Sequence, residues 1–267
     1  MRAFLLEMGR AGGGEERHDD EVVWTVGGSP LGYHNAVVAC SASPARFDEL
    51  AEEWASALDR RGVPGSWHVP PSMRPDDLVD RLLARGWDDG GDEPAMVADL
   101  GAATPRVGGV AGLGIGRVRT PADLDAYRAV LAAGFGEGPP EAAWVTDVFG
   151  RIGLGDDVAW RHWVGRLENL PVATVSMFLH PPEVAGIYFV STTPAVRRRG
   201  IGAAVTAHAL SEARRLGCTA AVLGSSPMGQ GLYRRLGFEE VFRYRLLERA
   251  AGASQRTTSS SSPLSTS

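Results

Sequence analysis

Two blocks of the chain show the same order of helical and strand-like patterns of apolar residues. In the first block, apolar residues from Phe47 to Leu58 recur at helical spacing, which predicts a helix over residues 45–61. A second helix is expected over 75–85, with Pro75 at its start. Runs rich in β-forming residues predict strands over 21–26, 35–40, 67–69 and 95–100. The segment before them, residues 1–20, is rich in glycine and charge after its first few positions, so we expect it to be loosely structured.

The second block begins after residue 114. Thr120 has the chemistry of an N-cap and Pro121 that of a first helical residue, so a helix is expected to begin there. Gly217 is placed to end a later helix as its C′ residue. The remaining elements predicted for this block are helices over 141–151, 203–216 and 228–236, and strands over 115–119, 158–165, 172–180, 219–223 and 238–247.

The order of elements repeats between the blocks. Helix 45–61, strand 67–69, helix 75–85 and strand 95–100 follow the order of helix 203–216, strand 219–223, helix 228–236 and strand 238–247. With roughly 150 residues as the usual size of a domain, the length of 267 residues favours two domains over one. We therefore predict an α/β protein of two similar halves, residues 1–100 and 115–249, joined by a Gly-rich linker over 101–114. A Ser/Thr-rich tail over 250–267 is too polar to order.

The composition restricts the possible partners. The chain is 44% hydrophobic and 22% charged, has a net charge of −5 and contains no lysine. An acidic chain without a basic block argues against a nucleic-acid partner. No apolar run approaches the roughly 18 residues of a membrane span, so no membrane partner is expected. Cys40 and Cys218 stand apart from each other and from any metal-ligand spacing, so we expect buried free thiols, no metal and a cytoplasmic location.

The stretch from Gly186 to Gly202 stands out chemically. A β-forming run reaches Thr192-Thr193-Pro194, and a loop with Arg197, Arg198 and Arg199 then leads to Gly200 and Gly202 at the start of a long Ala-rich helix. A helix N-terminus leaves backbone N–H groups free to bind an anion, and glycines let a phosphate approach the backbone. This pattern predicts a pyrophosphate cradle; the alternative is a solvated basic helix start.

Two motifs together resemble a known family. Arg197-x-x-Gly200-x-Gly202 resembles the Gln/Arg-x-x-Gly-x-Gly/Ala signature of the GNAT superfamily of N-acetyltransferases. Leu232-Tyr233-x-x-x-Gly237-Phe238 resembles the second hallmark of that superfamily, and the helix and strand between the motifs also agree. The resemblance covers about residues 115–249 and implies the mixed-sheet GNAT fold.

The resemblance implies a donor site and an activity. It places the pyrophosphate of acetyl-CoA on the backbone of residues Arg197, Arg198, Arg199, Gly200, Ile201, Gly202 and Ala203. It places the pantetheine arm along the strand at Val190 and Thr192, with Ser226 where the family often has Asn. Tyr233 would protonate the leaving thiolate as general acid; the alternative is a packed aromatic side chain. The implied function is transfer of an acyl group to an amine by direct attack on the thioester.

Several assignments stay open. Glu183, His180, Glu168 and Glu137 are candidates for the general base, but each is interpreted in the first place as a surface residue, so no base is assigned. Trp144, Trp160 and Trp163 could line an acceptor pocket or simply pack the sheet, whereas His162 is interpreted as structural. A catalytically silent CoA-binding sensor or structural protein with the same fold is the alternative function. The resemblance does not identify the amine, and the chain could be a monomer or a homodimer.

The first block lacks the features of the second. The loop over 41–46 has no glycine and one arginine, and Leu82-Leu83-Ala84-Arg85-Gly86-Trp87 aligns with Tyr233 to Phe238, so Leu82 stands where Tyr233 stands. If this half is a diverged copy of the same fold, it has lost both the anion cradle and the acid. We expect it to contribute packing and the shape of the substrate pocket.

Overall fold

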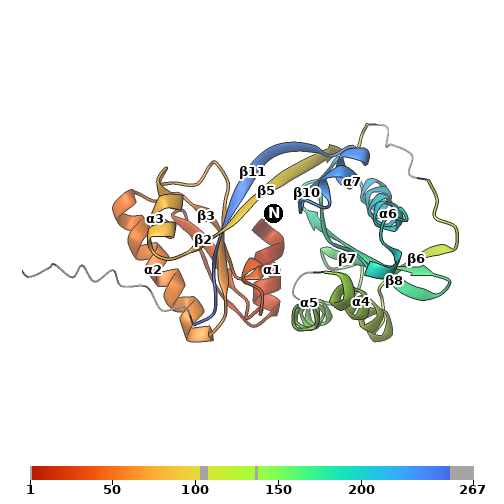
Figure 1. Ribbon diagram of the computed structural model, residues 1–267, viewed down its shortest axis with the longest axis horizontal. Coiled ribbons are helices and arrows are strands. Elements are labelled where there is room, and N and C mark those ends of the chain that lie inside the picture. Colours follow the sequence, from red (N-terminus) through yellow and green to blue (C-terminus); the bar gives the residue numbers. More distant parts are fainter. Residues whose placement is uncertain (1, 103–107, 136–137, 253–267) are drawn as a thin grey trace, which may run out of the picture.

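The strands of the protein form one continuous mixed sheet that runs through both halves. In the computed structural model, which describes residues 2–102, 108–135 and 138–252, the strand order is β1-β2-β3-β4-β11-β5-β10-β9-β8-β7-β6. Parts of the predicted linker (103–107) and most of the predicted tail (253–267) lie outside the described residues. A mixed sheet with helices on its faces is the α/β architecture expected from the sequence (Figure 1).

The elements follow the predicted order closely. The first half contains α1 (Arg2–Ala11), β1 (Glu15–His18), β2 (Val22–Val26), η1 (Gly32–His34), β3 (Ala36–Cys40), α2 (Pro44–Arg61), β4 (Gly65–Val69), α3 (Leu78–Ala84) and β5 (Asp88–Asp99). The second contains β6 (Leu113–Arg117), α4 (Pro121–Gly134), α5 (Pro139–Ile152), β7 (Trp160–Leu167), β8 (Leu170–His180), β9 (Val184–Thr192), η2 (Pro194–Val196), α6 (Ile201–Arg215), β10 (Ala220–Gly224), α7 (Gln230–Arg235) and β11 (Glu239–Arg249). No helix in these parts of the chain is long and apolar enough to cross a membrane.

The predicted caps are present. The Thr120 side chain accepts a hydrogen bond from the Asp123 backbone, and the Asp123 carboxylate bonds back to the Thr120 N–H, which is a capping box. Gly217 has a φ of +88° just beyond α6, the left-handed conformation expected of a C′ glycine. Glu168 and Asn169 both have positive φ in the two-residue turn between β7 and β8, as a type I′ hairpin turn requires.

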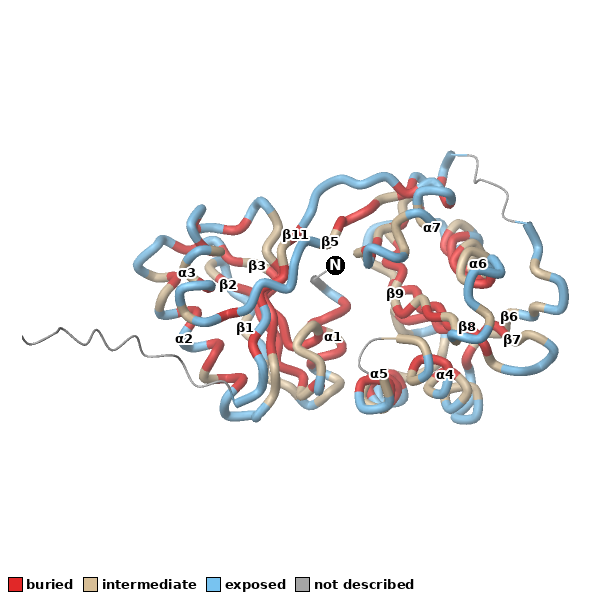
Figure 2. The backbone as a smooth tube through the Cα atoms, viewed as in Figure 1, coloured by how far each residue is buried: buried red, intermediate tan, exposed pale blue. Residues whose placement is uncertain are grey.

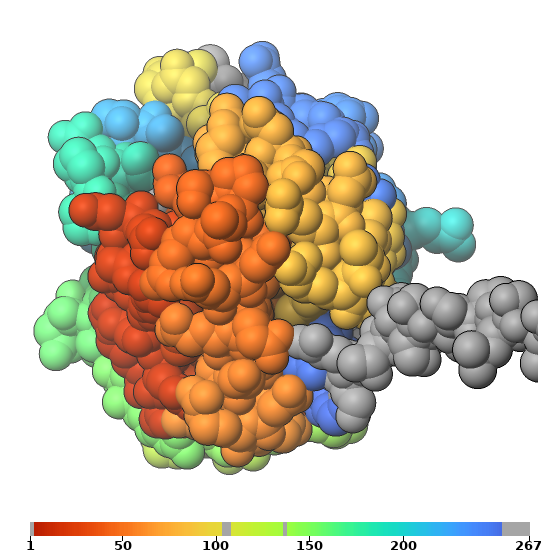
Figure 3. Space-filling view, turned by 90° about the vertical axis from the view of Figure 1, so that its left-hand side faces the viewer, coloured from red at the N-terminus to blue at the C-terminus, as the bar shows by residue number. Residues whose placement is uncertain are grey.

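The two halves exchange their last strands. β5, from the first half, pairs antiparallel with β10, whereas β11, from the second half, pairs antiparallel with β4. β5 and β11 also pair with each other from Glu239 to Glu248, and they form the long arch between the halves in Figure 1. The face of the first half in Figure 3 accordingly includes blue residues from the end of the chain. Each half therefore completes the sheet of the other.

The expectation that residues 1–20 are loosely structured is wrong. Residues 2–11 form helix α1, and Phe4, Leu5, Leu6 and Met8 are all buried. These side chains share a core with residues of α4, α5 and the second-half strands, and Figure 2 shows the buried α1 between the halves. The apolar positions bury because a partner surface from the far half covers them, and no local sequence signal reports that surface.

Corresponding features confirm that the halves repeat one another. Gly86 and Gly237 follow the equivalent short helices with φ of +82° and +89°. The N–H of Trp87 donates to the carbonyl of Leu82, and the N–H of Phe238 donates to that of Tyr233 in the same way. Leu82 is fully buried in the first-half core.

In the first half, the loop after β4 occupies the gap between β3 and β4. β3 and β4 pair in parallel over two residue pairs and then separate, but the following loop enters the gap. The N–H of Arg74 donates to the carbonyl of Cys40, an isolated bridge joins Ser41 to Arg74, and Met73 is buried in the core beside them. The loop between β4 and α3 therefore fills the space between β3 and β4 that stays open between β9 and β10.

Candidate functional site

Strands β9 and β10 diverge and leave the backbone of β9 exposed to a cavity. They pair in parallel from Val184 to Gly186 of β9, after which β9 continues to Thr192 without pairing to β10. The register of β9 against β8 shifts near Phe189, whose φ is +50°. The Thr174 hydroxyl donates to the Phe189 carbonyl and holds this bulge. Bulges of this kind commonly lie beside active sites because they redirect the backbone.

The loop after β9 presents backbone N–H groups at the start of α6. Among the described residues, the N–H groups of residues 198–203 have no backbone acceptor, and the first bond of the turn runs from Ala204 to the Gly200 carbonyl. Gly200 is the N-cap residue with a φ of +79° and provides no side-chain cap. Arg198 also has a positive φ, of +61°. The arrangement leaves donors and the positive end of the helix dipole available to an anion.

The three arginines of the loop have different surroundings. Arg197 donates from Nε to the Thr192 carbonyl and from Nη2 to the Gly134 carbonyl, so it fastens the loop to the ends of β9 and α4. Arg198 and Arg199 are exposed and, within the described ranges, form no ion pair. Arg197 is therefore placed to shape the loop, and Arg198 and Arg199 are placed to add positive charge.

The second motif lies against the first. Leu232 and Tyr233 pack onto the hydrophobic core below α6, and Tyr233 contacts Phe238 edge to face. No described residue bonds to the Tyr233 hydroxyl, while burial raises the pKa of Tyr233 to about 12. The phenol is therefore protonated at neutral pH and its proton is available. Ser226 is exposed in the loop between β10 and α7.

One cavity of about 400 Å³ brings these elements together. Val190, Ser226 and Tyr233, three of the predicted site residues, line it. Its other walls come from both halves of the chain, including Phe4 of α1, Tyr33 of η1 and Glu93 of the exchanged strand β5. The site is thus composite, and the predicted contribution of the first half to the shape of a pocket is present.

A hydrogen-bonded chain of polar side chains forms part of the wall. Tyr244 donates to Glu93 Oε2 over 2.5 Å, and the hydroxyls of Tyr33 and Tyr244 are 3.2 Å apart. Because the Tyr244 proton is used on Glu93, the Tyr33 hydroxyl is the donor to Tyr244. His68 stacks on Tyr244 and contacts the Tyr33 ring at a tilt, and its Nε2 lies 2.9 Å from Ser66 Oγ.

A second buried polar contact joins the halves at the same cavity. His34 Nε2 lies 3.9 Å from Glu141 Oε1, and both side chains are almost fully buried. His34 also stacks on Trp144 and contacts Ser29 Oγ through Nδ1. Burial lowers the pKa of His34 to about 3, so its imidazole is neutral.

Sequence reasoning missed these cavity residues. A strand was expected only from residue 95, whereas β5 begins at Asp88 and so includes Glu93. Tyr33 and Glu141 carry no motif. Glu93 reaches the site because β5 pairs with a strand of the second half. A sequence pattern within the first half does not indicate this pairing.

The structure shows which of the candidate bases and tryptophans lie at the cavity. Glu168 and Glu183 lie in exposed turns and do not line the cavity, and Glu137 lies outside the described residues. His180 Nε2 is 3.2 Å from the hydroxyl of Tyr188, a cavity residue. The three tryptophans pack instead: Trp160 and Trp163 are buried in the core, and Trp144 covers His34.

The predictions for His162 and for the two cysteines are confirmed. His162 is fully buried, with Nδ1 2.7 Å from Ser176 Oγ, which confirms a structural imidazole. Cys40 and Cys218 are buried free thiols, as predicted.

Comparisons with known proteins agree with this geometry. The model of the acetyltransferase (GNAT) family matches residues 127–238. A solved GCN5-related N-acetyltransferase from Kribbella flavida is 20% identical with a TM-score of 0.73, and the match covers 94% of each chain. A GCN5-related N-acetyltransferase from Sphaerobacter thermophilus is 20% identical with a TM-score of 0.62, over 86% of this chain and 81% of that one.

A tandem GNAT protein from the clavulanic acid biosynthesis pathway also shares the fold. It is 16% identical with a TM-score of 0.54, and the match covers 88% of this chain and 79% of that one. No curated protein matches the chain. Residues 127–238 are therefore a GNAT acetyltransferase domain, set in a chain whose two-part fold is shared with solved GNAT proteins.

Proposed function

We propose that this protein transfers the acetyl group of acetyl-CoA to a primary amine in the composite cavity beside β9 and β10. The observation that carries the proposal is that Val190, Ser226 and Tyr233 line one cavity beside the diverging strands. The same strand, β9, leads from that cavity to the loop whose N–H groups are open at the start of α6. A donor with a thioester at one end and a pyrophosphate along its length fits this path.

Each part of the donor has a matching group in the chain. The N–H groups of residues 198–203 and the charges of Arg198 and Arg199 bind the pyrophosphate. The exposed backbone of β9 at Val190 and Thr192 pairs with the amides of the pantetheine arm, and Ser226 offers a hydroxyl from the opposite side. Tyr233 gives its proton to the thiolate as the carbon–sulfur bond breaks.

The cavity walls favour a cationic amine with an apolar body. Glu93, Glu141 and Glu248 contribute carboxylates to the wall, and the chain carries a net charge of −5. Phe4, Phe135, Tyr188 and Phe189 contribute aromatic faces. Aromatic rings and carboxylates together attract an ammonium group and its hydrocarbon portion.

A thiol-release assay with acetyl-CoA tests the proposal directly. A panel of 2-phenylethylamine, spermidine, glucosamine and a lysine-containing peptide compares acceptors of different shape, with 2-phenylethylamine expected to react fastest. Calorimetry measures acetyl-CoA binding in parallel. Binding without acceptor-stimulated thiol release from any amine would favour a CoA-binding protein without turnover.

A further inference from the structure

Glu93 reaches the proposed acetyl-transfer site from the other half of the chain. It lies on β5, where it faces Tyr244 of β11 across the pair of exchanged strands. A Cβ atom built on Gly224, the last residue of β10, would lie 3.6 Å from Glu93 Oε2 and 2.4 Å from the Tyr244 hydroxyl. Glu93 is therefore beside the end of β10, where that strand has separated from β9, and it shares the cavity with Tyr233.

The position of Glu93 is held by a fixed donor. Tyr244 donates to Glu93 Oε2, and Tyr33 donates to Tyr244. Burial, the largest cause, raises the pKa of both phenols above the ordinary range, so the two hydroxyls keep their protons. One carboxylate oxygen is thus occupied by a donor, which leaves Oε1 as the oxygen that can take a proton.

We propose that Glu93 is the general base of the transfer, supplied to the second-half site by strand exchange. This inference rests on the proposed function. The bound ammonium gives one proton to Glu93 Oε1, and the free amine nitrogen then adds to the thioester carbonyl carbon. The carbon–sulfur bond breaks as Tyr233 protonates the thiolate, and the second N–H proton replaces the one that Tyr233 lost. Glu93 releases its proton to solvent, so the products are an amide, CoA and one proton.

Several titratable groups surround Glu93. β11 presents Tyr244 and Glu248, the η1 segment presents Tyr33 and His34, and β4 presents His68. Across the cavity, the second half adds Glu141, Tyr188 and Tyr233. Burial holds the pKa of both His34 and His68 at about 3, so neither imidazole supplies a positive charge near neutral pH. Among these groups, Tyr244 is the one that donates a hydrogen bond to Glu93.

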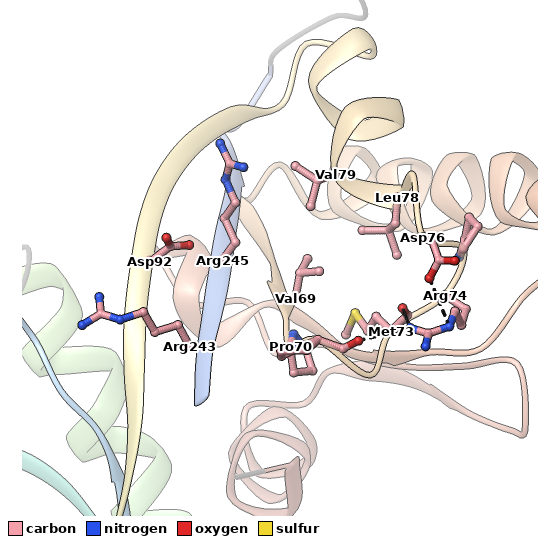
Figure 4. A pocket seen from close by; sticks show the side chains of 12 residues that line it. Val69, Pro70, Met73, Arg74, Asp76, Leu78, Val79, Asp92, Arg243 and Arg245 are labelled. Carbon is pink, nitrogen blue, oxygen red and sulfur yellow. Dashed lines mark hydrogen bonds and ion pairs between the residues drawn. The ribbon is translucent and has the colours of Figure 1, made fainter. Parts of the chain in front are cut away.

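The neighbouring residue on β5 provides a matched control. Successive strand residues point to opposite faces, so Asp92 points away from the site. It lines a separate cavity of about 240 Å³ with Arg243 and Arg245 (Figure 4). Asp92→Asn removes the same charge from the same strand without altering the donor site.

The experiment measures the pH dependence of thiol release for wild type, Glu93→Gln and Asp92→Asn, with 2-phenylethylamine as the first acceptor. Glu93→Gln should lower the turnover number at pH 7 by about 10²-fold or more, with acetyl-CoA affinity unchanged. Its rate should keep rising with pH as the amine loses its proton to solvent. Asp92→Asn should stay within about twofold of wild type, which is inside the range of ordinary surface substitutions.

Two further variants separate proton transfer from structure. Tyr244→Phe keeps the carboxylate but removes the hydrogen bond that positions it, so turnover should fall while acetyl-CoA affinity stays unchanged. Glu93→Ala should regain turnover when formate, a small carboxylate, is added.

Different outcomes overturn different statements. A fully active Glu93→Gln enzyme beside an active wild type would overturn the assignment of Glu93 and leave the proposed function intact. A wild type that binds acetyl-CoA but acetylates no amine of the panel would overturn both. An equal loss in Asp92→Asn, or a Glu93→Ala variant that formate does not restore, would reduce Glu93 to a structural residue.

Discussion

Gly202 and Leu232 lie against each other, one from each of the two sequence motifs. A Cβ atom on Gly202 would come within 3.3 Å of Leu232 Cδ1 and 3.5 Å of Thr192 Oγ1. Such a contact is tighter than most side chains allow, so a glycine at this position brings α6 close to α7 and to the end of β9. The loop at the start of α6 and the helix that carries Tyr233 are thus held together by direct packing.

Charge and bulk at the first glycine of the loop should block the donor. We expect Gly200→Glu to weaken acetyl-CoA binding at least about tenfold, or ~1.4 kcal/mol, because it places a carboxylate where the pyrophosphate binds. Calorimetry measures the affinity. Gly217→Glu is the matched control, since Gly217 also has positive φ but lies at the other end of α6. Equal affinity for the two variants would contradict the cradle.

The hydroxyl of Tyr233 should matter for rate and not for binding. Tyr233→Phe is expected to lower turnover by about 10²-fold, with acetyl-CoA affinity unaltered. Because the pKa of Tyr233 is raised to about 12, no alkaline limb from this group should appear below about pH 11. Tyr127→Phe is the control: its hydroxyl bonds to Ser176 in the core, so it should affect stability alone. An undiminished rate in Tyr233→Phe would remove the acid role.

Arg197 and Arg198 should differ in effect although they are neighbours. Arg197→Ala removes the bonds to Thr192 and Gly134, so we expect a lower melting temperature together with weaker donor binding. Arg198→Ala removes an exposed charge, and the melting temperature should stay unchanged while acetyl-CoA affinity falls and depends less on salt. Melting curves and calorimetry at two ionic strengths check both. Identical behaviour of the two variants would contradict their separate roles.

The N-terminal helix should contribute strongly to stability. Leu5 is fully buried, so Leu5→Ala should reduce the free energy of unfolding by about 2–5 kcal/mol. Arg10 is on the exposed face of the same helix and forms a surface ion pair with Glu16. Apart from the small contribution of that ion pair, Arg10→Ala should change the free energy of unfolding by less than about 0.5 kcal/mol. Urea unfolding measures both, and a tolerant Leu5 would mean that α1 does not pack between the halves.

The free energy of unfolding should decrease as the pH is lowered from about 6.5. Burial lowers the pKa of His34 and His68 to about 3, and that of His162 lies well below its usual value. In the window between these values and about 6.5, the unfolded chain binds protons that the folded protein does not. Each such histidine therefore costs up to about 1.4 kcal/mol of stability per pH unit as the pH decreases. Urea midpoints at pH 7.5 and 5.5 test this, and His68→Gln should show a smaller difference than wild type.

The sequence by itself determined most elements of this protein, their order and the position of the two motifs. Helical spacing, the Thr120 cap and the glycines after helices are local signals, and each depends on residues within a few positions of one another. The repeated order of elements and the Leu82–Tyr233 correspondence were also visible, because the two halves keep the same local turn after α3 and α7.

The tertiary structure decided what completes the site. A strand has the same sequence pattern whether it pairs with strands of its own half or with strands of the other half. The exchange of β5 and β11 could therefore not be predicted from a pattern within one half. That exchange places Glu93 beside Gly224, and the packing of α1 between the halves places Phe4 on the same cavity. Partners far apart along the chain decide these contacts, and their free energy comes from surfaces that exist only once both halves have folded together.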